Sequence, residues 1–228
     1  MAKEEKKTAT RTSIDELNES LSTMEQRVEK NQRKIVWYIV GLLVVIGLGL
    51  GWYYGIYRSG VDKATEQIGK ADIALAQGQD SLALAQYQAV ASEYSNGVAN
   101  RANLNAAILL YQKGKYQEAL NSLKDYDVEE ELVGAAAQSL MGDCYVNLKK
   151  YDDAISCYDK AVSTSGDNAL YAPLFLVKKA TVLAAQGKHA DEAAIYQTIK
   201  DKYPKYVMAY RMNIDKYIER ANYLAGQK

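Results

Sequence analysis

An unbroken run of uncharged residues, from Ile35 to Tyr57, limits most strongly what this chain can fold into. A helix of these twenty-three residues would measure about 34 Å, and the hydrocarbon core of a bilayer is about 30 Å thick. Tryptophan and tyrosine lie at both ends of the run, and basic residues lie just outside it, as is typical of membrane-crossing segments. The run therefore predicts a single transmembrane helix.

A cleaved signal peptide is the alternative interpretation of this run. The apolar core of a signal peptide has roughly 7 to 15 residues, which is shorter than the segment seen here. The run also follows a polar tail of 34 residues, and Tyr53, Tyr54 and Tyr57 stand where a cleavage site would need small residues. These features favour an anchor that is retained.

Basic residues on the two flanks predict the orientation of the anchor. Arg27, Lys30, Arg33 and Lys34 precede the run within eight residues, whereas only Arg58 and Lys63 follow it within eight. The positive flank of a membrane helix usually stays in the cytoplasm. We therefore expect a cytoplasmic tail (1–34), a transmembrane helix (35–57) and an exported domain (58–228), which would be periplasmic in a Gram-negative bacterium.

The cytoplasmic tail carries an apolar heptad pattern. Its members are Ile14, Leu17, Leu21, Met24 and Val28, and Ser13 with Glu16 forms a capping box at its start. Two interpretations remain open: a short coiled coil that forms a homodimer, and a lone amphipathic helix that lies on the membrane or on a partner.

Three glycines of the predicted transmembrane helix recur every fourth residue. They are Gly47, Gly51 and Gly55, and they lie on one helix face. Because this face has no side chains, another membrane helix can approach it closely. Two interpretations remain open: lateral association with another helix at this face, and a small-residue face of the kind common in membrane helices.

The exported region contains a tandem repeat, whose clearest copy runs from Met141 to Ala161. It resembles the tetratricopeptide repeat, a helix-turn-helix in which small residues meet at the closest contact and large residues fill the groove. Gly142 and Ala154 match the small pair of that family. The remaining matches are Tyr145, Tyr151, Tyr158 and Ala161.

Weaker copies flank this unit and predict the fold class. Their turns lie near Gly78, Gly114 and Gly187, and the turn of the clearest copy lies near Lys149. The turn-to-turn spacings are therefore 36, 35 and 38 residues, close to the 34 of this repeat. Two prolines in the whole chain leave long helices uninterrupted. We expect an all-α solenoid of about four repeats after one transmembrane helix, closed by a C-terminal capping helix from Tyr206 to Leu224.

Charge and motif content exclude several classes of function. The 28 basic and 28 acidic residues cancel, which leaves no electrostatic footprint for nucleic acid. No phosphate-binding glycine loop, metal-ligand cluster or nucleophile motif occurs, so we expect no enzyme activity, no cofactor and no metal. Cys144 and Cys157 are predicted to be buried free thiols, and His189 to be a surface residue in a turn.

The first helices of such repeats line a concave surface that commonly binds a peptide or a partner helix. Counting from the turns, we expect this face to carry Arg101, Leu104, Ile108, Tyr111, Asp143, Val146, Asn147, Val177 and Thr181. Co-chaperone repeats that hold acidic C-termini carry lysine and asparagine where this chain has Ser139 and Asp143. That clamp is therefore missing.

The plan of a charged tail, one anchor and a small exported repeat domain resembles the bacterial YfgM family. The resemblance implies an inner-membrane ancillary subunit of the SecYEG translocon that associates with a periplasmic membrane-anchored prolyl isomerase chaperone, PpiD. Two other functions remain open. One is a scaffold or regulator of envelope complex assembly in the same membrane, and the other, with inverted topology, is a cytosolic receptor for precursor proteins.

Overall fold

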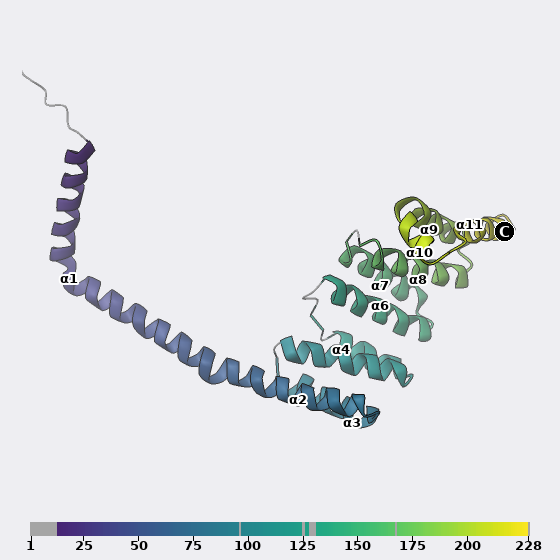
Figure 1. Ribbon diagram of the computed structural model, residues 1–228, viewed down its shortest axis with the longest axis horizontal. Coiled ribbons are helices and arrows are strands. Elements are labelled where there is room, and N and C mark those ends of the chain that lie inside the picture. The colour runs from purple at the N-terminus through teal and green to yellow at the C-terminus, as the bar shows by residue number, and fades with distance from the viewer. Residues whose placement is uncertain (1–12, 96, 125, 128–130, 167, 228) are drawn as a thin grey trace, which may run out of the picture. The chain divides into compact units, whose positions relative to one another are not determined.

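The computed structural model describes residues 13–95, 97–124, 126–127, 131–166 and 168–227, with side chains for Ser22 and for those from Gln32 onward. All elements of these residues are helices (Figure 1), which confirms the predicted all-α class. The chain divides into two compact units between Ser59 and Gly60.

The first unit consists of α1 (Ser13–Trp52) and the short π-helix η1 (Tyr53–Tyr57). Side chains from Val36 to Tyr57 are exposed, including Trp37 at 75% and Leu48 at 70%. Within the described residues one helical run, Gln32–Ala76, is long and apolar enough to cross a membrane. The heptad positions Ile14, Leu17, Leu21, Met24 and Val28 fall on α1, but their side chains lie outside the described part.

Helices of the second unit pair into four successive hairpins, which are stacked side by side (Figure 1). The pairs are α2 (Arg58–Ala76) with α3 (Asp80–Glu93), α4 (Gly97–Gln112) with α5 (Tyr116–Lys124), α6 (Glu131–Asn147) with α7 (Tyr151–Thr164), and α8 (Tyr171–Ala185) with α9 (His189–Lys202). The number and the register of the predicted repeats match these hairpins.

A left-handed residue closes each hairpin directly after its first helix. These residues and their φ angles are Gly78 (72°), Gly114 (74°), Lys149 (59°) and Gly187 (69°). At the second hairpin, Gly114 N–H donates to the Tyr111 carbonyl and Lys115 N–H donates to the Leu110 carbonyl, both at 2.9 Å. The other three hairpins repeat this pair of bonds, which satisfies the last free carbonyls of the helix.

Lys149 is the exception among these residues, because a side chain in the left-handed region costs about 1 kcal/mol or more. We expect Lys149→Gly to raise the free energy of unfolding by about 0.5–1 kcal/mol. Urea unfolding of the full chain in detergent, followed by circular dichroism, measures the change. Lys150→Gly is the matched control, since φ of Lys150 is −93° and glycine brings no relief there. Equal effects of the two substitutions would contradict the explanation.

Close packing inside the hairpins depends on missing side-chain volume. A Cβ atom added to Gly142 on α6 would lie 2.6 Å from Cε1 of Tyr158 on α7. The Tyr158 ring is buried beside Ala154 and Val182, and its hydroxyl group is hydrogen-bonded, so the ring has no free space to move into. The small residue predicted at position 142 thus accommodates an aromatic ring.

Gly142→Ala is expected to lower the free energy of unfolding by about 1–3 kcal/mol, because the added methyl group overpacks this contact. Gly69→Ala on α2 is a control of opposite sign, since a Cβ there meets no atom within 4 Å. That change removes only the helix penalty of glycine, about 0.5–1 kcal/mol. Denaturant unfolding of both variants tests the pair, and a neutral Gly142→Ala would show that the contact is not tight.

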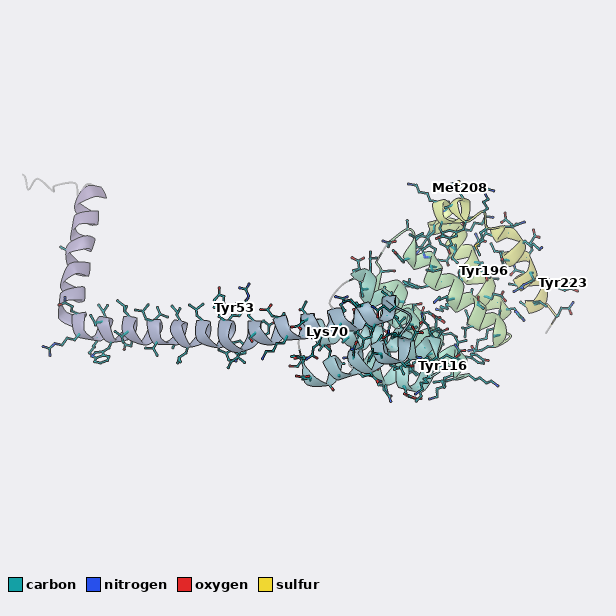
Figure 2. All side chains as sticks on the ribbon, turned by 60° about the horizontal axis from the view of Figure 1, so that its bottom comes forward. Tyr53, Lys70, Tyr116, Tyr196, Met208 and Tyr223 are labelled. Carbon is teal, nitrogen blue, oxygen red and sulfur yellow. The ribbon has the colours of Figure 1, made fainter. Side chains whose placement is uncertain are left out.

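The end of the stack departs from the single capping helix predicted between Tyr206 and Leu224. Two helices occur instead, α10 (Pro204–Ala209) and α11 (Ile214–Ala225). Arg211, with φ of 48°, ends α10, and its N–H and that of Met212 donate back to Met208 and Val207. Met208 and Tyr223 on these helices point outward (Figure 2). Neither glycine nor proline marks this break, so the sequence pattern missed it.

Candidate partner-binding face

The nine residues predicted to face a partner lie on three neighbouring first helices. Helix α6 contacts both α4 and α8, so the structure brings all three groups together. Arg101, Ile108, Asn147 and Thr181 are exposed, whereas Leu104, Tyr111, Asp143, Val146 and Val177 are half-buried. A hollow of about 200 Å³ beside Ile108 is also lined by Leu75, Tyr87 and Gln112.

Half-buried members of this face also pack inside the domain. Leu104 and Tyr111 contact the core cluster around Leu110, and the Tyr111 ring lies 5.5 Å from the Tyr116 ring. Tests of partner binding are therefore cleaner at the exposed positions Ile108 and Thr181, whose side chains contribute less to the core.

Asp143 holds neighbouring helices together. One carboxylate oxygen accepts a hydrogen bond from the Tyr158 hydroxyl at 2.7 Å, and the other contacts Lys178 Nζ at 2.6 Å. Lys178, on α8, also donates to Ser139 Oγ at 3.0 Å. Asp143 therefore joins α6 to its own hairpin partner α7 and to the next hairpin.

The first hairpin repeats this arrangement with other residues. Tyr87 on α3 donates to Asp72 on α2, and Arg101 on α4 pairs with the second oxygen of the same carboxylate. These Asp–Tyr–cation contacts were not predicted from the sequence, although the Asp–Tyr spacing of 15 residues is the same in both hairpins. That spacing is the signal that would have found it.

Burial and the adjacent carboxylates change the acidity of the two tyrosines. Burial first, and then the bond to Asp72, raises the pKa of Tyr87 to about 12. Burial and the Asp143 charge raise the pKa of Tyr158 in the same way. Both phenols stay protonated in the folded state, where each donates a hydrogen bond across its hairpin.

A raised folded-state pKa predicts a pH dependence of stability. The contribution of Tyr87 is fully present below the unfolded pKa of about 10 and is lost as pH rises towards its folded pKa of about 12. The raised pKa of Tyr158 makes its contribution decline in the same direction above pH 10. In the variant that combines Tyr87→Phe and Tyr158→Phe, we expect a lower free energy of unfolding at neutral pH, by about 0.5–1.5 kcal/mol per hydrogen bond. Its further decrease between pH 10 and 12 should be smaller than in the wild type. Urea unfolding at stepped pH measures both, and identical pH profiles would contradict this account.

His189 is not the surface residue that the sequence predicted. Only 18% of its side chain is exposed, and Nδ1 lies 2.9 Å from Oε2 of the fully buried Glu192. Arg220 of α11 contacts the other oxygen of Glu192 at 2.8 Å. The prediction failed because the sequence pattern does not show that His189 contacts a buried carboxylate, which Arg220 of the later helix α11 also contacts.

Cys144 and Cys157 are buried free thiols, as predicted. Burial raises the pKa of the Cys144 thiol to about 12 and that of Cys157 in the same direction, which disfavours the thiolate that metals and oxidants need. Among the described residues no cluster of three or more His, Cys, Asp or Glu is placed to hold a metal ion.

A family model described as a tetratricopeptide repeat-like domain matches residues 57–184, more than half of the chain. This chain belongs to the tetratricopeptide repeat-like family. Domains of this family are typically non-enzymatic modules that bind other proteins, and the stacked hairpins have the geometry for that role. No curated protein matches the sequence.

Several solved structures share the fold at low sequence identity. MamA is 19% identical with a TM-score of 0.52, and the match covers 69% of this chain and 95% of MamA. YrrB, titled a TPR protein with an unusual peptide-binding site, is 15% identical with a TM-score of 0.51 and coverages of 74% and 92%. PilF of Pseudomonas aeruginosa is 16% identical with a TM-score of 0.51 and coverages of 77% and 86%. These likenesses concern the fold.

Proposed function

We propose that this chain is a single-pass membrane protein of the bacterial inner membrane, whose periplasmic repeat domain binds partner proteins. The observation that carries the proposal is an exposed apolar helix that directly precedes a repeat domain. Domains of this family typically bind other proteins. In water this helix would leave large apolar side chains such as Trp37 and Leu48 uncovered, which is unfavourable by about 25 cal/mol per Å². A bilayer removes that cost.

The glycine face of the helix supports contact with another membrane helix. A Cβ added at Gly47, Gly51 or Gly55 would meet no atom within 4 Å, so this side is uncovered in the chain by itself. Close helix approach at small residues is a common mode of association within membranes. The anchor would then contribute to partner choice as well as to localisation.

We further propose that the partners are the SecYEG translocon and a PpiD-like periplasmic chaperone. This step rests on the resemblance of the whole plan to the YfgM family. The anchor would lie beside the translocon. The nine-residue partner face on α4, α6 and α8, which we call the first-helix face, would contact the chaperone or an emerging, still extended polypeptide. The exposed apolar side chain of Ile108 can pack against apolar segments of a polypeptide that has not yet folded.

Site-specific photocrosslinking in native membranes tests the proposal. Photoreactive residues at Gly51 and at Ile108 should give adducts with translocon subunits and with a periplasmic chaperone or nascent chain, respectively, identified by mass spectrometry. A probe at Leu82 is the matched control, because Leu82 is a similarly exposed aliphatic residue on α3, the second helix of its hairpin. It should not give the adducts of Ile108.

Substitution adds a second readout. Ile108→Asp combined with Thr181→Asp should abolish the adducts of a groove probe at Asn147, whereas Leu82→Asp should leave them unchanged. Adducts with envelope-assembly proteins at both probes would replace the translocon by the scaffold function. Protease accessibility of the repeats in intact spheroplasts tests the orientation, and full protection would contradict a periplasmic domain.

A further inference from the structure

The C-terminal end of the stack contains a second hollow that the sequence did not predict. It has a volume of about 610 Å³ and lies between α8, α10 and α11. Val177 of the first-helix face forms one wall, and three tyrosines and three basic residues line most of the rest. We call it the C-terminal pocket.

The lining of the C-terminal pocket is cationic. Among the described residues it includes Arg211, Lys216 and Arg220 but no aspartate or glutamate. The charge of Arg220 is balanced by the buried Glu192, whereas neither Arg211 nor Lys216 forms an ion pair within the described part of the chain. Two positive charges therefore face this pocket with no ion-pair partner among the described residues.

A larger groove of about 770 Å³ between α7, α8 and α9 shows the contrast. Its lining carries three aspartates and three lysines. Lys179 pairs with Asp159 at 2.6 Å, and Lys188 pairs with Asp152 at 3.3 Å. Charges in that groove largely neutralise each other, whereas the described lining of the C-terminal pocket keeps an excess of positive charge.

The pocket also offers aromatic surface and the positive end of a helix. The rings of Tyr206 and Tyr210 lie 4.5 Å apart, and Tyr217 packs against Tyr196 at 5.1 Å. Asn213 caps α11 by accepting a hydrogen bond from Lys216 N–H at 3.2 Å. The N-terminal end of α11, which favours negative charge, thus lies at the pocket wall.

Arg211 occupies its position at a conformational cost. It ends α10 with φ of 48°, the role that glycine has at Gly78, Gly114 and Gly187. A side chain in this conformation costs about 1 kcal/mol or more, so glycine would be the more stable residue here. Such strain commonly lies at binding sites, where the side chain is needed.

We propose that the C-terminal pocket binds an acidic segment of a partner polypeptide. Carboxylates of the segment pair with Arg211 and Lys216, and an adjacent apolar or aromatic side chain packs on Tyr210 and Tyr217. Val177 connects the pocket to the first-helix face, so an extended chain can contact both. The inference rests on the proposed protein-binding function and names the chemistry of its partner.

Selection from a library of random heptapeptides tests the proposal, with the full-length protein in detergent micelles as the target. Peptides captured by the wild type should be enriched in aspartate and glutamate over the input library. For one enriched peptide, fluorescence anisotropy should show at least about tenfold weaker binding when its carboxylates are replaced by amides. No acidic enrichment, or equal binding of the amide peptide, would overturn the proposal.

Arg211→Gly separates binding from folding. It removes one cation and also the backbone strain, so the melting temperature should stay equal or rise while the acidic peptide binds about tenfold more weakly. Lys216→Glu should weaken binding similarly. Lys205→Glu is the matched control, because Lys205 is an exposed cation on α10 that does not line the pocket. Unchanged affinity of Arg211→Gly and Lys216→Glu would overturn the pocket assignment.

Different outcomes would reject the acidic pocket and the protein-binding face. Crosslinks at Ile108 that survive Lys216→Glu, together with no acidic enrichment, would retain a protein-binding face and reject the acidic pocket. Vesicles containing phosphatidylglycerol form a separate arm. If these vesicles displace the acidic peptide, and Lys216→Glu abolishes vesicle binding, the pocket is a lipid headgroup site and the proposal of a polypeptide ligand is wrong.

Discussion

Closure of each hairpin by a left-handed residue is the constraint on which the repeat domain depends. Because the backbone turns back at the same point after every first helix, the two helices of a hairpin meet in the same register each time. That register places Gly142 opposite Tyr158 and brings Asp72 within reach of Tyr87. A shift of one helix by one residue relative to the other would separate these partners.

Polar contacts then connect one hairpin to the next. The carboxylates of Asp72 and Asp143 each accept a tyrosine hydroxyl from their own hairpin and a cation from the following one. Small apolar residues alone would allow neighbouring hairpins to slide, whereas a charged hydrogen bond fixes the position of both atoms. Asp143 and Arg101 also lie on the face predicted for partners, so part of that face serves the domain itself.

The C-terminal end closes the stack by a different device. Glu192 is fully buried, and its charge is acceptable there because Arg220 and His189 contact its two oxygens. This arrangement holds α11 against α9. It also places Arg211 and Lys216 around a pocket where no carboxylate of the described part of the chain pairs with them, so the end of the repeat array differs chemically from its middle.

Local sequence determined the long apolar helix, the hairpins and their register, because an uncharged run, turn glycines and small residues at fixed spacing act between residues close in the chain. The partner role of the face around Ile108 stays a prediction. Only the tertiary structure decided that Asp143 is occupied by Lys178, that His189 is covered, and that α10 and α11 are separate. The physical reason is that these outcomes depend on ion pairs and burial between helices distant in sequence, which no local pattern records.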